Sequence, residues 1–416
     1  MRVLAGECNG EEFYIDFEEG ANNNSLFVGM AGTGKSTLVK SILFRMRRSI
    51  RNNIIVIDFT GEYSVLEKAG FKHLIPGVNF YLNPFGLPEG RDILLYYIRY
   101  AFGREITPIQ LAIISDLTES YDNLEDMINY LRDRISRTRD EGLRNAYSAV
   151  LNRIRPLGEF NIFRGNSSLP PGLLHLNLAY LPGNMVKVFF TITLLYYLYF
   201  MALRGEYTSF IVIDEAERVA KPFLIQSNVE RNIVTMVYDE LRKYGLFMFL
   251  ITHTLALLDR EVRNNVRHLF VFKLQDPDDV SLASKMLLVR YEDVINTRRY
   301  HFWYKPETTA AVRVKVLPEP IVLSYRFRPI TPIRRMSFRN LVEMVEGLNL
   351  TDVEKRIMRD ILSDRRLLEA MINRDYKTIG ESFPELVKTY DDGQRFSTMG
   401  QKLYNIIKIH IEKYIS

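Results

Sequence analysis

Cysteine and tryptophan are the residues that this sequence has least of, with one of each in 416 residues. The lone Cys8 excludes an internal disulfide and a cysteine-based zinc site, and it fits a reducing compartment. The first residues, Met1-Arg2-Val3, show no sign of a secretory signal peptide. We also find no internal repeat and no low-complexity tract. The expected location is therefore the cytoplasm.

Positive charge is only slightly in excess of negative charge. The 55 Lys and Arg residues exceed the 50 Asp and Glu residues by five, which gives a pI near 9.0. Spread over this length, that excess is weak evidence for an anionic partner, so an argument for nucleic acid must rest on local patches. The hydrophobic fraction of 47% is enough for a large core. We expect one large domain with appendages.

Long hydrophobic runs are also scarce. The run from Val186 to Leu203 is almost wholly apolar apart from Lys187 and two threonines, and it is at the short end for crossing a bilayer. It directly precedes a predicted central strand, and a membrane-spanning helix at this position would be incompatible with a sheet built around that strand. We interpret the run as a buried helix packed on a sheet, and we predict no transmembrane segment.

A phosphate-binding motif is the strongest signal present. The run from Gly29 to Thr37 fits G-x-x-x-x-G-K-[ST], with an apolar strand at 25–28 before it and a helix at 38–45 after it. Glycines let backbone N–H groups point at phosphate oxygens, and the helix adds the positive end of its dipole. We predict ATP and Mg²⁺ as cofactors. The expected nucleotide-binding residues are Gly29, Ala31, Gly32, Thr33, Gly34, Lys35, Ser36 and Thr37, with Lys35 on the β/γ-phosphates and Ser36 on Mg²⁺.

Two carboxylates far downstream complete a predicted hydrolytic site. Phe210 to Ile213 reads as a buried strand, and Asp214 and Glu215 follow it. Ligands bind at the carboxyl ends of strands in open α/β sheets. We expect Asp214 to hold Mg²⁺, partly through water, and Glu215 to orient the attacking water. A solvated turn is the alternative, and the P-loop makes it the weaker one.

Strands alternating with helices predict an α/β fold with a mostly parallel sheet. We expect an ATPase domain over residues 1–320, with a helical insertion over about 104–160 in which Thr107 caps the first helix ahead of Pro108. Residues 321–416 should form a strand-like linker, broken by prolines, and a small helical region from about Leu341. The other expected elements are a hairpin over 3–17 and strands at 53–58, 173–177, 247–252 and 269–273.

A set of short elements in fixed order resembles a known family. Asp58-Phe59-Thr60-Gly61-Glu62-Tyr63 and Asn83-Pro84-Phe85 follow the P-loop, and Asp214 to Glu217, Arg242-Lys243-Tyr244-Gly245 and Thr252-His253-Thr254 come later. This pattern, over residues 10 to 285, resembles the HerA/FtsK group of P-loop ATPases. It is most similar to the HerA branch, with the conjugation ATPases beside it. The resemblance implies a RecA-like core, a hexameric ring and ATP-driven movement of double-stranded DNA through its pore.

The sequence departs from the family pattern in two respects. HerA proteins carry an N-terminal β-barrel that is associated with docking of the NurA nuclease, and we find no such barrel here. A nuclease partner is therefore in doubt. Second, His253 stands where the family often has glutamine. A histidine can still hydrogen-bond a γ-phosphate or its water, and it would make activity sensitive to pH. A core histidine at a strand end is the alternative.

The resemblance also assigns catalytic candidates whose roles depend on assembly. Arg242 would be the arginine that neutralises the γ-phosphate of the neighbouring subunit, because a planar guanidinium suits a phosphoryl group. A solvated arginine at a helix end, closed by Gly245, is the other interpretation. Glu62 would orient water or magnesium, or it would only cap a turn.

DNA contacts are harder to place. A translocase needs Lys and Arg facing phosphates and no base readout. Arg260, Arg263 and Arg267 recur at the spacing of one helical face, and Arg298 and Arg299 adjoin an aromatic residue, but solvated faces are the more common explanation. The tail adds Arg334, Arg335 and Arg339, where a small DNA- or partner-binding domain and a lid on the neighbouring subunit are equally compatible with the sequence.

Two other functions fit the same residues. One is a motor ATPase of a secretion, conjugation or virus-packaging machine, docked on a membrane or a capsid, with DNA or protein as cargo. The other is a nucleotide-dependent assembly switch, in which hydrolysis only times binding. Stimulation of hydrolysis by DNA separates a translocase from a switch.

Overall fold

The computed structural model describes residues 1–18, 21–47, 53–77, 79–87, 90–102, 106–158, 162–163, 169–181, 183–220, 233–325, 350–391 and 393–410. Contacts between residues divide the chain into two units, Met1–Ile330 and Thr331–Ser416. Each unit buries hydrophobic side chains of its own.

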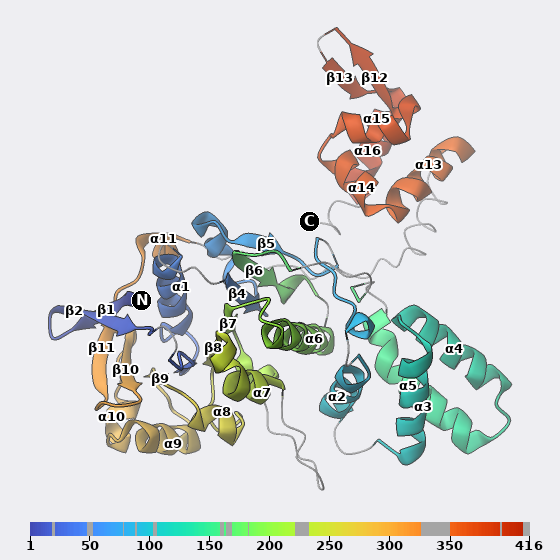
Figure 1. The fold of residues 1–416 in the computed structure, drawn as a ribbon. Coiled ribbons are helices and arrows are strands. Elements are labelled where there is room, and N and C mark those ends of the chain that lie inside the picture. The colour runs from blue at the N-terminus through green and yellow to red at the C-terminus, as the bar shows by residue number, and fades with distance from the viewer. Residues whose placement is uncertain are drawn as a thin grey trace. The chain divides into compact units, whose positions relative to one another are not determined.

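A single large sheet organises the first unit (Figure 1). In the described residues it has eleven strands in the order β2-β1-β11-β10-β9-β3-β8-β7-β4-β6-β5. The seven strands from β9 to β5 are parallel, and the other four are antiparallel, so the predicted mostly parallel α/β fold is confirmed. The strands are β1 (Arg2–Cys8), β2 (Glu11–Asp16), β3 (Ser25–Val28), β4 (Asn53–Asp58), β5 (Lys72–Leu74), β6 (Leu173–Asn177), β7 (Ser209–Ile213), β8 (Leu246–Thr252), β9 (His268–Val271), β10 (His301–Pro306) and β11 (Val312–Val316).

The antiparallel edge was predicted in part. β1 and β2 form the expected hairpin, and Asn9 and Gly10 at its turn have φ angles of 54° and 88°. Positive φ at both central residues is what a type I′ turn requires, and Asn-Gly supplies it. β10 and β11 were not predicted from the sequence. These strands connect the hairpin to the parallel strands, because β11 pairs with β1 and β10 pairs with β9.

Both faces of the parallel sheet are buried under helices, which is why its strands are apolar throughout. Phe210 and Val212 of β7 pack on the face covered by α1 (Lys35–Met46). Ile211 and Ile213, which alternate with them, pack on the opposite face with α6 (Asn184–Leu203) and α7 (Ile233–Glu240). Helices thus lie on both faces of the sheet (Figure 1), and each face has a core of its own.

The apolar helix predicted at 186–203 is α6. It is the one helix of the described residues that is long and apolar enough to cross a membrane, yet 67% of its most apolar stretch is buried inside the protein. It contacts α2 (Gly90–Phe102) and α7, and residues such as Phe189 and Leu195 are fully buried. The prediction of a core helix is confirmed.

The helical insertion begins with a strong cap. Thr107 accepts a hydrogen bond from the amide of Gln110, the Gln110 side chain accepts one from the amide of Thr107, and Pro108 is the first helical residue. This capping box satisfies two backbone donors that a helix start leaves unpaired. The helices that follow are α3 (Pro108–Ser120), α4 (Leu124–Arg137) and α5 (Glu141–Gly158), which pack on one another (Figure 1).

The segment after Pro318 differs from the prediction. A strand-like stretch is wrong for Pro320–Ser324, which form the short helix α11, because Pro320 occupies the first helical position, where its missing N–H costs nothing. Pro329, Pro332, Arg334, Arg335 and Arg339 lie outside the described residues. The remaining elements of this unit are η1 (Ser64–Ala69), η2 (Pro84–Gly86), η3 (Leu178–Tyr180), η4 (Ala216–Arg218), η5 (Leu241–Tyr244), α8 (Arg260–Asn264), α9 (Pro277–Leu287) and α10 (Tyr291–Ile295).

The second unit has a small core of its own, formed by residues such as Ile357, Met371 and Leu403. Its helices agree with the predicted amphipathic segments, but the hairpin of β12 and β13 was not predicted, since its residues are mostly exposed and polar. The elements are α13 (Asp352–Ser363), α14 (Arg365–Ile372), α15 (Tyr376–Ser382), η6 (Pro384–Leu386), β12 (Val387–Tyr390), β13 (Gly393–Phe396) and α16 (Thr398–His410).

The buried Asn24 just before β3 generates a stability prediction. Its side chain donates to the carbonyl of Tyr238 at 2.6 Å and accepts from the amide of Met248 at 2.9 Å. Asn24→Ala leaves both backbone groups buried without a partner, so we expect a loss of about 2–4 kcal/mol in the free energy of unfolding. Urea denaturation of the full chain measures it. Asn129→Ala, at an exposed position, should change stability by less than about 0.5 kcal/mol. Equal losses would contradict this account.

Candidate functional site

Four adjacent strands carry the predicted site residues to one edge of the sheet. β3, β8, β7 and β4 lie side by side and parallel. Their carboxyl ends lead into the P-loop, His253, Asp214 and the loop from Asp58 to Tyr63, respectively. Segments far apart in the sequence therefore meet at the edge where ligands bind in open α/β sheets.

The P-loop has the backbone conformation that its glycines allow. Gly29, Gly32 and Gly34 have φ angles of 153°, 74° and 115°, which L side chains rarely adopt. Gly34 precedes α1, and its carbonyl accepts from the amide of Leu38 at 2.9 Å. The Thr33 hydroxyl donates to the carbonyl of Met30 at 2.7 Å. This turn, ending at a helix N-terminus, fits a phosphate group.

Lys35 is the cation of this loop, and its residue is only 5% exposed. Its ammonium donates to the carbonyls of Gly29 and Met30, the latter at 2.9 Å, and lies 3.2 Å from His253 Nδ1. Burial lowers the pKa of Lys35 to about 8, although the nearby carboxylates, Asp214 first among them, act to raise it. The structure thus brings His253 to the P-loop lysine, in keeping with its predicted place at the nucleotide site.

Asp214 is buried directly after β7, and its amide donates to the carbonyl of Ile57 at 3.2 Å. Burial raises the pKa of Asp214 well above its ordinary value, and the neighbouring carboxylates Asp58, Glu62 and Glu215 add to the effect. Such a concentration of negative charge is relieved by a divalent cation. Carboxylate oxygens are the ligands that Mg²⁺ prefers, so the donors present fit this ion.

Glu215 has a left-handed backbone, with φ 54° and ψ 46°, where the chain turns from β7 into η4. Such a conformation is uncommon for a residue other than glycine and costs about 1–2 kcal/mol. Its carboxylate pairs with the guanidinium of Arg218, which also donates to Asn184 and lies 5.6 Å from the ring centre of Phe59. Arg218 was not among the residues predicted from the sequence. The signal that could have found it is a basic residue three positions after an acidic one in a helical turn.

Asp58 organises the loop at the end of β4. Its buried carboxylate accepts hydrogen bonds from the amides of Gly61 at 2.7 Å and Tyr63 at 2.8 Å, and contacts His175 Nε2 at 3.0 Å. Burial acts to raise the pKa of Asp58, but the hydrogen bond from His175 and those from the backbone outweigh it and hold the pKa below its usual value. Glu62 of this loop lies 3.9 Å from the ammonium of Lys40.

Arg299, a predicted DNA contact, lies at the P-loop. Its Nε donates to the carbonyl of Gly32 at 2.9 Å, and the amide of the next residue, Tyr300, donates to the carbonyl of Thr33 at 2.9 Å. A Cβ on Gly34 would lie 2.9 Å from the Tyr300 ring. The antiparallel strand β10 thus begins against the phosphate-binding turn, a contact that was not predicted from the sequence. Arg298 beside it is exposed.

The three arginines predicted to share one helical face do not do so. Arg260 and Arg263 belong to α8, but this helix ends at Asn264, so Arg267 lies beyond it. The guanidinium of Arg267 pairs with Glu18 at 2.7 Å, and its backbone amide donates to the carbonyl of Asn24. The expected continuous face is wrong because the chain leaves the helix to enter β9.

Arg242 lies on η5, shortly before the first residue of β8, and its side chain is outside the described part of the structure. His253 follows the other end of the same strand. A strand of seven residues spans about 20 Å, so Arg242 starts from the edge of the sheet opposite to its own P-loop.

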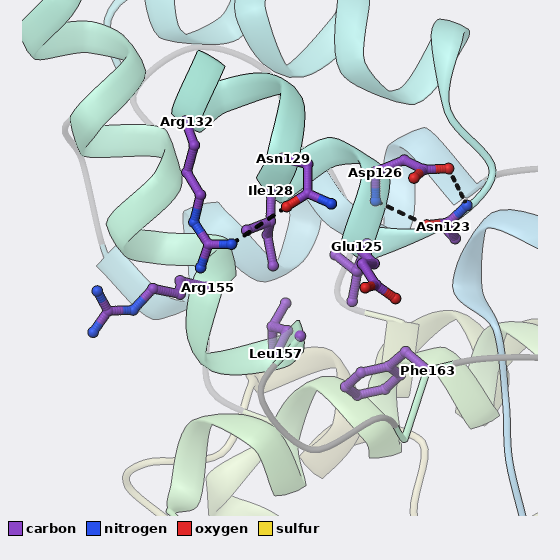
Figure 2. A pocket seen from close by; sticks show the side chains of 11 residues that line it. Asn123, Glu125, Asp126, Ile128, Asn129, Arg132, Arg155, Leu157 and Phe163 are labelled. Carbon is purple, nitrogen blue, oxygen red and sulfur yellow. Dashed lines mark hydrogen bonds between the residues drawn. The ribbon is translucent and has the colours of Figure 1, made fainter. Parts of the chain in front are cut away.

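A separate hollow of about 670 Å³ lies in the helical insertion, between the start of α4 and the end of α5 (Figure 2). Its lining carries both signs of charge, with Glu125 and Asp126 at one end and Arg132 and Arg155 at the other. None of the predicted site residues lines it, so we do not assign the nucleotide site there.

The crowding around Gly29 generates a prediction. A Cβ on Gly29 would lie 2.5 Å from the Cβ of Phe272, whereas a Cβ on Gly32 would meet nothing within 4 Å. Gly29→Ala should therefore cost more than about 3 kcal/mol, since backbone strain and a clash add together. Gly32→Ala, which has backbone strain alone, should cost about 1–2 kcal/mol. Urea denaturation measures both losses, and an equal cost would contradict the close approach of Phe272.

Comparisons with known proteins bear on the fold. Residues 6–181 match the family model described as the central domain of the helicase HerA. VirB4 of Thermoanaerobacter pseudethanolicus has a similar structure, with a TM-score of 0.61 and 14% identity over 77% of this chain and 98% of that one. The plasmid coupling protein TrwB in complex with ADP and Mg²⁺ is also similar, with a TM-score of 0.56 and 12% identity over 80% of this chain and 97% of that one. No curated protein matches the sequence.

At these identities the structural neighbours show the fold, which is the RecA-like core that the sequence elements predicted. The family match covers the P-loop and the Asp58 loop, and the strand that presents Asp214 completes the same edge. Residues 6–181 are thus similar to the HerA central domain, and the chain has the fold of VirB4 and TrwB.

Proposed function

We propose that this protein is an ATP-driven motor that moves double-stranded DNA through a ring of six subunits. The observation that carries the proposal is the meeting of Lys35, Asp214 and Glu215 at one edge of the sheet. A nucleotide-binding site needs only the first two. The second carboxylate gives the site a group that can orient water, which hydrolysis requires.

ATP and Mg²⁺ have residues suited to hold them. The backbone of Gly29 to Thr37 and the Lys35 ammonium would bind the phosphates, and Ser36 with Asp214 would hold Mg²⁺, partly through water. Bound Mg²⁺ would neutralise charge that develops on the phosphoryl oxygens. Glu215 would orient the attacking water, with Arg218 positioning its carboxylate. His253, in reach of Lys35, would contact the γ-phosphate or its water, and Glu62 would add to the carboxylates facing the site.

Arg242 supports a ring rather than a monomer. It precedes β8, while the site residue His253 follows that strand, and a strand of seven residues spans about 20 Å. A guanidinium cannot span that distance to its own nucleotide. We propose that Arg242 serves the nucleotide of the neighbouring subunit.

DNA would be held through its phosphates by arginines that are free of the nucleotide site. Arg260, Arg263 and Arg298 remain candidates for this role. Arg267 is paired with Glu18, and Arg299 contacts the P-loop, so we assign these two to the protein's own structure.

Other functions fit the same residues. VirB4 and the conjugative coupling protein TrwB share the fold, which favours a motor of a conjugation or secretion machine on a membrane as the second candidate, with DNA or protein as cargo. A packaging motor on a capsid, a nuclease partner and an assembly switch remain further hypotheses from the sequence.

The direct test is the ATPase rate of the full chain with and without double-stranded DNA. We expect DNA to stimulate hydrolysis, and DNA binding to be independent of sequence and to fall steeply with salt. Lys35→Ala should abolish hydrolysis and weaken ATP binding, because the triphosphate loses its loop cation. Glu215→Gln should keep ATP bound and stop turnover. Native turnover in Glu215→Gln would remove the water-orienting role, and hydrolysis indifferent to DNA would favour the switch.

Mixing of variants tests the ring. Arg242→Ala should lower turnover by roughly 10³ to 10⁵, as for other arginines supplied in trans, with ATP affinity nearly unchanged. Glu215→Gln subunits mixed with Arg242→Ala subunits should regain activity, because some interfaces then pair an intact Glu215 with an intact Arg242. Native mass spectrometry verifies that mixed rings form. A monomer that hydrolyses ATP at the full rate in the presence of DNA would refute the ring.

A further inference from the structure

Two histidines and a glutamate form a cluster that the nucleotide site does not use. His73 on β5 and His175 on β6 are register partners of neighbouring parallel strands, so both side chains lie on the same face of the sheet. Their rings stack with centroids 5.0 Å apart. Glu67 of η1 lies over them, with Oε1 3.0 Å from His73 Nδ1 and 3.9 Å from His175 Nδ1.

His175 is held as a metal-binding histidine would be. Its side chain is fully buried, and Nε2 contacts the Asp58 carboxylate at 3.0 Å. Because that carboxylate fixes the proton on Nε2, Nδ1 presents a lone pair. Nδ1 is buried and has no hydrogen-bond partner among the residues that the structure describes. A carboxylate that orients a histidine in this way is the usual outer shell of a zinc ligand, and a buried polar atom without a partner calls for an explanation.

The separations of the donor atoms fit a tetrahedral ion. Metal–ligand distances of about 2.0–2.1 Å place neighbouring ligands of a tetrahedron roughly 3.3 Å apart. The two distances from Glu67 Oε1, 3.0 and 3.9 Å, bracket that value, and all three donor atoms lie within 4.8 Å of one another. Two imidazoles and one carboxylate select zinc or a similar transition metal over Mg²⁺ or Ca²⁺, which prefer oxygen.

We propose that Glu67, His73 and His175 bind one Zn²⁺-type ion, with a water molecule in the fourth position. Glu67 is 43% exposed, which gives the ion a path from solvent. The site is distinct from the Mg²⁺ site of the nucleotide, since none of its three ligands follows β3 or β7. The proposal of this metal site does not depend on the proposed movement of DNA.

Such an ion would fix the loop that carries Glu62. Asp58 is shared between His175 and the amides of Gly61 and Tyr63, so an ion on His175 would hold the carboxylate that shapes this loop. It would also tie η1 to β5 and β6. We assign the ion a structural role beside the nucleotide site.

The test uses the full chain after treatment with a chelator, without nucleotide. Calorimetric titration with Zn²⁺ alone should show one ion per chain, and Co²⁺ should give the visible absorption of a four-coordinate site. His73→Gln and Glu67→Gln should each weaken Zn²⁺ binding at least tenfold, and the rise in melting temperature caused by Zn²⁺ should be lost in both.

His301→Gln is the matched control, because His301 is a partly exposed histidine on another strand, β10, and should leave Zn²⁺ binding unchanged. Circular dichroism establishes whether the variants are folded. If His73→Gln does not fold, the Zn²⁺ affinity of Glu67→Gln alone tests the proposal. Binding that is absent, or equally strong in the wild type and both variants, would mean an adventitious ion only and would overturn the proposal. Either result leaves the proposal of ATPase activity standing, since that proposal rests on the P-loop, Asp214 and Glu215.

Discussion

The parallel register of β3, β8, β7 and β4 is the constraint on which the site depends. Val28 is paired with Thr252, Ile213 with Leu250, and Ile57 with Ile213, so all four strands end close to the same edge. A shift of one residue would turn the apolar side chains of a strand to the wrong face, and the two cores hold the register against that. Packing of the sheet therefore brings together site residues that no single segment of the sequence contains.

The charged groups at this edge of the sheet come from different strands and interact with one another. Burial lowers the pKa of Lys35 and raises that of Asp214, because it disfavours the charged form of each, whereas the neighbouring carboxylates act to raise both values. Asp58 differs because backbone amides and His175 satisfy it. The first two are suited to phosphates and Mg²⁺, whereas Asp58 is suited to hold a loop. The same residue type thus has different uses that depend on its hydrogen-bond partners.

Strands on either side of the four central ones also contact this site. β10 begins at the phosphate-binding turn, with Arg299 and Tyr300 against Gly32 and Thr33. On β5 and β6, His73 and His175 are register partners, and His175 contacts Asp58, whose carboxylate holds the loop that follows β4. Through these contacts, β10 touches the P-loop and β6 touches the Asp58 loop.

The sequence by itself determined the P-loop, the strand that ends in Asp214, the buried helix α6 and the capped start of α3, because each is encoded by residues within a short window. The predicted position of His253 at a strand end also held, since β8 is a continuous apolar run. Only the tertiary structure decided the placement of Arg299, Arg267 and the histidine pair. Their partners are fixed by strand order, by the residue at which α8 ends and by the antiparallel strands β10 and β11, and none of these follows from local periodicity. A charged side chain has the same appearance in a sequence whether it faces solvent, a carbonyl or a carboxylate, because its role is set by what the fold places beside it.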